Sequence, residues 1–307
     1  MCNTPTSLIE AVRFFSDIDQ CNEYMRQIKW PDGNIVCPRC GSQKVAEIRT
    51  RKMLRCNEKG CRKQFSYKVG TIFEDSPLGL DKWFVAVWCV TNGKNGMSSH
   101  ELARDLGITQ KSAWHMLHRI RLAMQEGTFK KMSGVIEADE TFVGGKAKNM
   151  HKHIREKKIN GRGAVGKIIV QGIIERGGRV LAGVVRNSKR KTLQPNIREV
   201  VEAGSKVYTD ALKSYEGLSD IYIHETVDHA VEYVRGDVHT NSMENFWSLL
   251  KRGLKGTYIS VMPWHLFRYV DEQVFRFNER KLTDAQRFNA VMNRILGKRL
   301  QYSELTS

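Results

Sequence analysis

Four of the seven cysteines lie within 25 residues of one another and constrain the fold more than any other feature. Cys37 and Cys40 are separated by two residues, and Cys56 and Cys61 by four. Both spacings are typical of structural zinc sites, in which two turns bring their thiolates onto one ion. Four thiolates leave no open coordination position, so Zn²⁺ is expected to fold this module rather than to catalyse.

The residues between the two cysteine pairs predict a small hairpin. Two short alternating stretches, 45–49 and 52–55, have the pattern of strands. The sequence therefore predicts a zinc ribbon. Ribbons bind DNA, RNA or protein, so the partner is not decided by these residues. Cys2, Cys21 and Cys89 lack such spacing and are expected to be ordinary thiols.

The charge of the chain favours a polyanionic partner. Fifty Lys and Arg against 33 Asp and Glu give a net charge of +17, and 41% of the 307 residues are hydrophobic, enough for real cores. A basic surface alone also occurs on soluble proteins with other partners.

No apolar run reaches the length of a membrane span, and the N-terminus does not resemble a signal peptide, so we expect a cytoplasmic protein without membrane contact.

A pair of helices is predicted after the ribbon. An apolar run over 80–90, with Asp81 as its cap, precedes them. Ser98 and Glu101 have the spacing of a capping box, Gly107 ends the first helix, and Thr109 caps the second. Two short helices joined by a glycine-bearing turn, the second of them basic, indicate a helix-turn-helix.

The exposed face of the second helix is the candidate DNA-reading surface. Side chains expected along it are those of Gln110, Lys111, His115 and Arg119. A plain helical hairpin with a solvated charged face is the alternative.

The second half of the chain predicts a mixed sheet that carries three acids. Around Asp139 apolar and polar residues alternate as in a strand. A loop is predicted over residues 146–167, which include eight Lys or Arg; this loop either clamps phosphates or is a solvated charge run. Two further strands flank Gly177–Gly178, a helix runs to Gly204, Asp210 lies at the tip of a buried strand, another strand follows, and Glu244 lies on a helix. Such a carboxylate cluster suits two divalent ions, Mg²⁺ with Mn²⁺ as a substitute, in phosphoryl transfer.

Four motifs together resemble the DDE transposases of bacterial insertion sequences. These motifs are the CPRC ribbon, EADETFVGG, VYTDALKSY and HTNSMENFWSLLKRGLKGTY, and the most similar group is the ISXO-like one, related to Merlin elements. The resemblance spans about residues 37–280. It implies a ribonuclease-H-like catalytic core that cleaves DNA at the element ends and transfers the 3′-hydroxyl into target DNA.

The resemblance also implies roles for individual residues. Asp139, Asp210 and Glu244 match the acidic triad, and Lys251, two helical turns after Glu244, matches the associated lysine. An asparagine can replace the third acid in this group, so Asn241 and Asn245 are alternatives to Glu244. The family further implies double-stranded DNA, as terminal inverted repeats and target, and a homodimer or higher oligomer bound to it in the nucleoid.

Several neighbours of these residues allow more than one interpretation. Glu137 shares a strand face with Asp139 and either joins the site or is structural, whereas Glu140 is expected to point away. His239 and Asn241 are candidates for DNA contact, although helix capping by Thr240 or Asn241 fits equally well. Trp247 has the spacing of a core residue.

The predicted architecture is therefore a mixed α/β protein in four regions. These are a zinc ribbon (1–75), a helix-turn-helix (76–130), a ribonuclease-H-like catalytic domain (131–285) and a helical tail (286–307). The alternatives are a non-catalytic DNA-binding regulator, another metal nuclease on the same sheet architecture, and a degenerate, inactive transposase.

Overall fold

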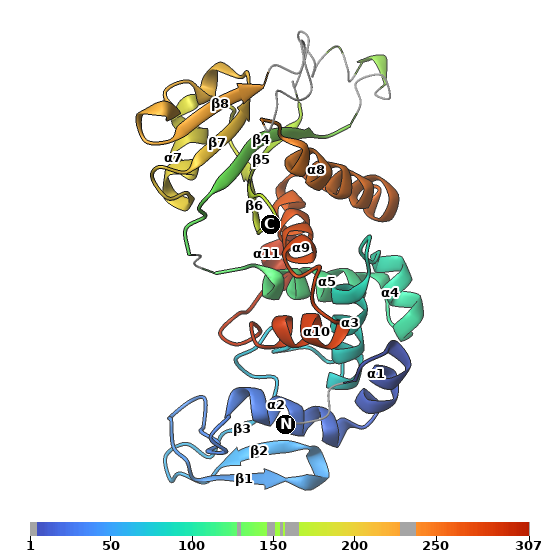
Figure 1. The fold of residues 1–307 in the computed structure, drawn as a ribbon. Coiled ribbons are helices and arrows are strands. Elements are labelled where there is room, and N and C mark those ends of the chain that lie inside the picture. Colours follow the sequence, from blue (N-terminus) through green and yellow to red (C-terminus); the bar gives the residue numbers. More distant parts are fainter. Residues whose placement is uncertain are drawn as a thin grey trace. The chain divides into compact units, whose positions relative to one another are not determined.

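A computed structural model describes residues 5–127, 130–145, 151–153, 156, 166–227 and 238–306. The chain divides into two compact units, one formed by 1–125 with 281–307 and the other by 126–280 (Figure 1). Most of the predicted basic loop at 146–167 lies outside the described residues. No helix within the described ranges is long and apolar enough to cross a membrane.

The first unit begins with two helices and the ribbon. Helices α1 (Leu8–Phe15) and α2 (Ile18–Lys29) precede a three-stranded antiparallel sheet of β1 (Val45–Ile48), β2 (Met53–Cys56) and β3 (Gln64–Phe65). The predicted hairpin is confirmed, since Val45 pairs with Cys56 and Ile48 with Met53.

A helical cluster completes the first unit. It contains α3 (Leu80–Asn92), α4 (Ser99–Leu106), α5 (Gln110–Met124), α10 (Asp284–Met292) and the short α11 (Tyr302–Thr306). The rings of Phe15, Phe84, Trp88 and Phe288 pack together at its centre, with centroids 5.1–6.2 Å apart. The aromatic contacts tie the two ends of the chain into one core.

The predicted helix ends in this cluster are largely confirmed. Ser98 and Glu101 form the capping box of α4, and Gly107 ends it in the left-handed conformation that glycine adopts without strain. Thr109 caps α5 by accepting from the Ser112 amide. The prediction for Asp81 was wrong, because Gly79 is the N-cap of α3 and Asp81 lies in its first turn.

The second unit is built on a five-stranded mixed sheet. Its strands are β4 (Val135–Val143), β5 (Ile168–Glu175), β6 (Val180–Val185), β7 (Lys206–Asp210) and β8 (Ile223–Val227), in the order β6-β5-β4-β7-β8. The first three pair antiparallel, whereas β4, β7 and β8 run parallel. Gly177 turns the β5–β6 hairpin at a φ of 72°, as the glycine pair predicted.

Helices cover both faces of this sheet (Figure 1). On one face α7 (Arg190–Val200) packs through Leu193 and Ile197 against β4, β5 and β7. On the other face lie α8 (Asn241–Gly253), a π-helical extension at Leu254–Tyr258, and α9 (Leu266–Asn278). The mixed α/β class is confirmed, and the arrangement is consistent with the predicted ribonuclease-H-like fold.

Helix α7 ends earlier than the sequence predicted. The expected end was Gly204, but Val201 is extended and forms a parallel bridge with Met132. The Met132 amide donates to the Val200 carbonyl at 2.7 Å, and the Glu202 amide donates to the Met132 carbonyl at 2.8 Å. Tertiary pairing of the backbone thus stops the helix before the glycine.

Candidate active site

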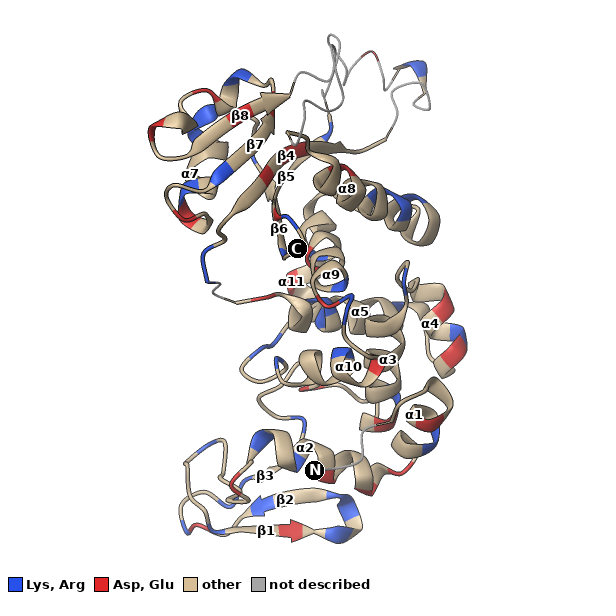
Figure 2. Ribbon diagram, in the orientation of Figure 1, with Lys and Arg blue, Asp and Glu red and all other residues tan. Residues whose placement is uncertain are grey.

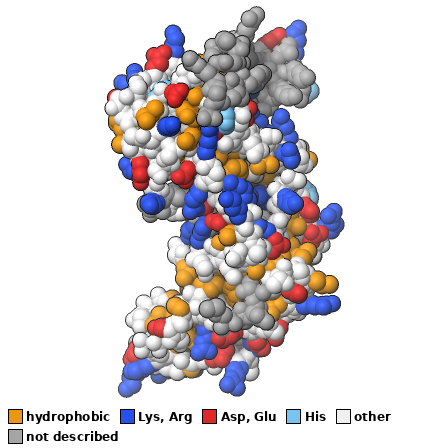
Figure 3. Space-filling view, in the orientation of Figure 1, with side chains coloured by type: hydrophobic (Ala, Val, Ile, Leu, Met, Phe, Trp, Pro, Cys, Tyr) orange, Lys and Arg blue, Asp and Glu red, His pale blue; other side chains and the backbone are white. Residues whose placement is uncertain are grey.

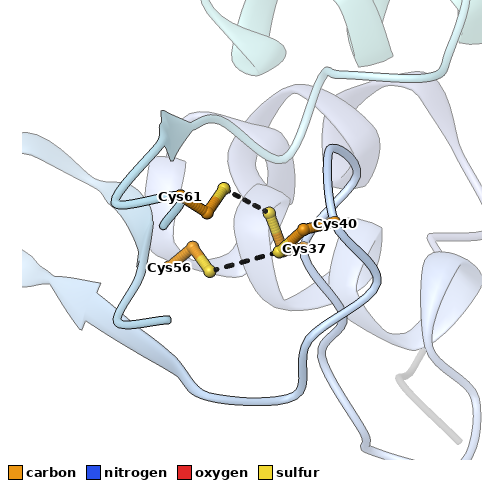
Figure 4. A group of neighbouring side chains, drawn as sticks. All are labelled: Cys37, Cys40, Cys56 and Cys61. Carbon is orange, nitrogen blue, oxygen red and sulfur yellow. Dashed lines mark hydrogen bonds between the residues drawn. The ribbon is translucent and has the colours of Figure 1, made fainter. Parts of the chain in front are cut away.

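The four clustered cysteines converge on one point in the first unit (Figure 4). Their sulfur atoms all lie within 4.8 Å of one another. The Sγ atoms of Cys37 and Cys61 are 3.8 Å apart, and those of Cys40 and Cys56 are 3.7 Å apart. A tetrahedron with Zn–S bonds of about 2.3 Å has an edge of about 3.8 Å, so the donor set fits a structural Zn²⁺.

Asp139 and Asp210 lie side by side in the second unit. Strands β4 and β7 are parallel neighbours, and their register pairs Ala138 with Thr209. The next position along each strand is an aspartate, and paired residues of adjacent strands point to the same face. The predicted meeting of two acids from distant parts of the sequence therefore follows from the strand register.

Asp139 is held in a largely buried and acidic environment. The Trp247 Nε1–H donates to its Oδ2 at 2.9 Å, and the Glu140 amide donates to its Oδ1 at 2.8 Å. Burial, together with the negative charges of Asp210 and Glu244, raises the pKa of Asp139 to about 6, and the two hydrogen bonds act in the opposite direction. A carboxylate in this setting is stabilised by a cation that restores its ionised form.

Helix α8 brings Glu244 and Lys251 to the same region. Glu244 lies in the first turn of α8 and is exposed, and its charge acts on Asp139. Lys251 lies in the last turn, beside Arg252, and makes that end of the helix basic (Figure 2). Burial lowers the pKa of Lys251, while attraction to Asp139 opposes that shift. The other three residues of the predicted catalytic set, Asp210, Glu244 and Lys251, thus lie within electrostatic reach of Asp139.

Glu137 is fully buried and binds the N-terminus of α8. Its Oε2 accepts from the amides of Ser242 at 2.9 Å and Met243 at 3.0 Å, and its Oε1 accepts from the Ser242 hydroxyl at 3.0 Å. Arg176 Nε donates to the same Oε1 at 2.7 Å. Four hydrogen bonds occupy both carboxylate oxygens, so Glu137 is poorly placed to hold a metal as well.

Glu140 faces the opposite side of β4. The Tyr215 hydroxyl donates to its Oε2 at 2.6 Å, on the face covered by α7. Burial, together with the charges of Asp210 and Asp139, raises the pKa of Glu140 to about 7 against the Tyr215 hydrogen bond. The Glu140 side chain points away from α8 as the alternation predicts, yet the negative charges of Asp139 and Asp210 still act on it.

Gly172 lets α8 approach the sheet beside Asp139. In the β4–β5 register Gly172 is the direct partner of Asp139. A Cβ at this position would lie 2.2 Å from Met243 Cε and 2.8 Å from two ring carbons of Trp247, Cζ2 and Cη2. The absence of a side chain at 172 therefore makes room for the indole that hydrogen-bonds Asp139.

The two DNA-contact candidates that precede α8 differ in their surroundings. His239 is partly buried, and Arg176 Nη2 donates both to its Nδ1 and to its carbonyl at 2.9 Å. Because an arginine can only donate, Nδ1 is the acceptor and the ring carries its N–H on Nε2. Asn241 is exposed at the first position of α8.

The face of α5 differs from the prediction. Gln110 and Lys111 are exposed at its N-terminal end. Arg119 is only 4% exposed, donates to the Glu74 carbonyl and lies 5.3 Å from the Trp83 ring, so the prediction of an exposed Arg119 was wrong. His115 is partly covered, and its Nε2 lies 3.2 Å from the Leu300 carbonyl. The C-terminal segment packs on this side of the helix, which helical periodicity alone does not reveal.

Sequence reasoning missed three contributors to the site. Trp247 is a core residue as predicted, but its indole also hydrogen-bonds Asp139. Neither Arg176 nor Gly172 belongs to a motif. A glycine inside a strand rich in Ile and Val signals close approach of another element, and this signal was available for Gly172.

Comparison with known proteins connects both halves of the chain to one class of protein. Residues 131–278 match the family described as the ISXO2-like transposase domain, and residues 16–64 match the transposase zinc-ribbon domain. An uncharacterized protein in transposable element ISH50 of Halobacterium salinarum is 28% identical over 241 residues, covering 75% of this chain and 81% of that protein. An uncharacterized transposase-like protein of Haemophilus influenzae is 32% identical over 105 residues, covering 34% of this chain and 85% of that protein.

Proposed function

The chain belongs to the ISXO2-like transposases, and on that premise we propose that it cuts DNA at its element's ends and joins them to target DNA. The observation that carries this proposal is the acidic site on one face of the sheet. Asp139 and Asp210 hold adjacent positions on parallel strands, and the charge of Glu244 acts on Asp139. We assign these three side chains as the ligands of Mg²⁺, which Mn²⁺ can replace.

The residues present fit divalent ions of this kind. Carboxylate oxygens are the donors that Mg²⁺ prefers, and the burial of Asp139 beside other negative charges favours a bound cation. Among the described residues, a close group of three or more potential ligand atoms occurs at the four cysteines and not at the three acids. Bound at the three acids, Mg²⁺ supplies charge neutralisation at the phosphoryl oxygens and activation of the nucleophile.

The reaction needs no energy source beyond the phosphodiester bonds themselves. Water attacks the phosphorus at the element end, the bond to the 3′-oxygen breaks, and a free 3′-hydroxyl is produced. This hydroxyl then attacks a target phosphorus and displaces the target 3′-oxygen, so one phosphodiester forms as another breaks. The chain contains no Gly-Lys-Ser/Thr phosphate loop, in agreement with a reaction that does not consume ATP.

The chain's own side chains position the DNA. Lys251 lies within electrostatic reach of Asp139 and is suited to bind the phosphate next to the scissile one. The Nε2–H of His239 and the exposed amide of Asn241 are donors at the start of α8. Lys and Arg side chains lie on the surfaces of both units, as a polyanionic substrate requires (Figure 3).

Recognition of the terminal inverted repeats is assigned to the first unit. The zinc ribbon and the N-terminal end of α5, with Gln110 and Lys111 exposed, form the proposed reading surface. In a helix-turn-helix the first residues of the second helix contact base edges, so the burial of Arg119 is compatible with this role. Concerted cutting of two ends requires two active sites, and we propose a dimer or higher oligomer on DNA.

A strand-transfer assay tests the proposal. Purified protein is incubated with Mg²⁺ and DNA bearing the element's ends, and wild type is compared with Asp139→Asn, Asp210→Asn and Glu244→Gln. Cut and joined products from wild type alone support the proposal. Binding without cutting by all four proteins supports a regulator or an inactive transposase, and cutting without joining supports another nuclease. If only Glu244→Gln stays active, Asn241 or Asn245 replaces it as the third ligand.

A further inference from the structure

The N-terminus of α8 is capped by a side chain from a different part of the chain. The N-cap position is Thr240, and the second and third residues of the helix are Ser242 and Met243. Their amides are the ones that an N-cap side chain ordinarily satisfies. Here both donate to Glu137, more than 100 positions earlier in the sequence, on the central strand β4.

This contact joins two of the proposed metal ligands. Glu137 lies two residues before Asp139 on the same face of β4. Ser242 and Met243 immediately precede Glu244 on α8. The carboxylate of Glu137 therefore links the backbone that carries Asp139 to the backbone that carries Glu244, over a path of very few residues.

Arg176 adds further bonds to the contact between Glu137 and the start of α8. Arg176 donates to Glu137 Oε1 at 2.7 Å, and its Nη2 donates to the carbonyl and Nδ1 of His239 at 2.9 Å. Its guanidinium also lies 4.9 Å from the ring centroid of Tyr208 on β7. The segment entering α8 is thus attached to β4 and approaches the strand that carries Asp210. A buried carboxylate with four hydrogen bonds and an arginine partner has little freedom to move.

We propose that Glu137 is a positioning residue, which fixes the start of α8 on β4 and thereby sets the distance between Glu244 and Asp139. The inference rests on the proposed function, because it assumes that these two acids hold metal together. It gives Glu137 no contact with metal or DNA. Supporting residues of this kind typically change metal affinity about 10–100-fold when they are replaced.

Metal affinity measured without DNA tests the proposal separately from activity. The probe is Tb³⁺, a hard cation that binds carboxylates and is excited by a nearby indole. Trp247 donates to Asp139, so its indole is well placed to sensitise an ion bound there. Mg²⁺ is then titrated to displace Tb³⁺. Asp139→Asn supplies the baseline without the site.

Glu137→Gln keeps the shape of the side chain but leaves one oxygen to accept where two accepted before. We expect it to weaken Tb³⁺ and Mg²⁺ binding at least about tenfold, with DNA-end binding retained. Glu126→Gln is the matched control. Glu126 is a buried carboxylate of the same unit, paired with Arg179 at 2.8 Å and with Asn278 at 3.1 Å, and none of these contacts involves the start of α8. The control should bind metal like wild type.

Each outcome decides the matter. Unchanged metal affinity in a folded Glu137→Gln protein overturns the proposal, as does an equal loss in Glu126→Gln. If Glu137→Gln does not fold, Glu137→Asp decides, since it keeps the charge but is one methylene too short to hold both amides of α8 as Glu137 does. A severalfold loss of metal affinity in Glu137→Asp supports the proposal, and no loss overturns it. If wild type binds Tb³⁺ at the site but neither cuts nor joins DNA, the proposed function fails while the positioning role stands.

Discussion

A methyl group added at Gly172 should push α8 away from the sheet next to Asp139, the residue that pairs with Gly172. The new Cβ would lie 2.2 Å from Met243 Cε and 2.8 Å from two carbons of the Trp247 ring. The methionine terminus can rotate away at little cost, whereas the indole is rigid, buried and hydrogen-bonded to Asp139 at 2.9 Å. The ring must therefore shift by several tenths of an ångström, and the helix or the hydrogen bond must yield.

The expected cost of Gly172→Ala follows from this overpacking. Inserting a methyl group into a filled core typically costs about 1–3 kcal/mol, which lowers the melting temperature of a unit this size by about 2–12 °C. Because the strain falls on the partner of Asp139, DNA cleavage should decrease at least about tenfold under conditions where the protein is folded.

Gly183→Ala is the matched control for this experiment. Gly183 lies on the neighbouring strand β6 and is exposed, and a methyl group added there would meet no atom within 4 Å. This variant should melt within about one degree of wild type and retain cleavage. Thermal denaturation and the cleavage assay are run on both variants. If Gly172→Ala matches Gly183→Ala in both measurements, the close approach of α8 does not support the site as described.

Four further predictions concern the metals, DNA binding and the stability of the first unit. Removal of zinc by a chelator, or the substitution Cys56→Ser, should unfold the ribbon and abolish binding to the element ends. Elemental analysis should show that one Zn²⁺ per chain is lost. Affinity for Mg²⁺ should fall as the pH is lowered through about 6, because the pKa of Asp139 is raised and protons compete with the metal from that pH downward. Calorimetric titrations at pH 5 and pH 8 check this prediction, and equal affinities at the two pH values would contradict it. Lys111→Ala should weaken end binding and lower the slope of log K against log salt by about 1. Arg119→Ala should instead lower the melting temperature, because its side chain is buried against Glu74 and Trp83.

The features that sequence predicts well here are those fixed by local spacing. Cys37 and Cys40 form one tight turn, and the capping box at Ser98 is complete within four residues. Likewise the alternating residues around Asp139 determine which side chains share a face of β4. In each case the physical cause lies within a few positions of the residue, so the pattern alone carries it.

The features that the sequence left open or predicted wrongly depend on partners far along the chain. Whether Glu137 joins the metal site or is structural is decided only by Ser242 and Met243, which donate to it. Arg119 has the helical position of an exposed cation, but it packs on Trp83 in α3. The end of α7 moves because Met132 pairs with Val201. Tertiary contacts decide these positions, and they override the local preference.

The measurement that tests the metal-ligand assignment most directly is a change of metal preference at Asp139. Asp139→Cys replaces a hard oxygen ligand by a sulfur, which Mg²⁺ accepts poorly and Mn²⁺ tolerates better. We expect this variant to be inactive in cleavage and joining with Mg²⁺ and to recover measurable activity with Mn²⁺, while Asp139→Ala stays inactive with both. Activity of Asp139→Ala, or equal activity of Asp139→Cys with the two metals, would contradict the assignment of Asp139 as a catalytic metal ligand.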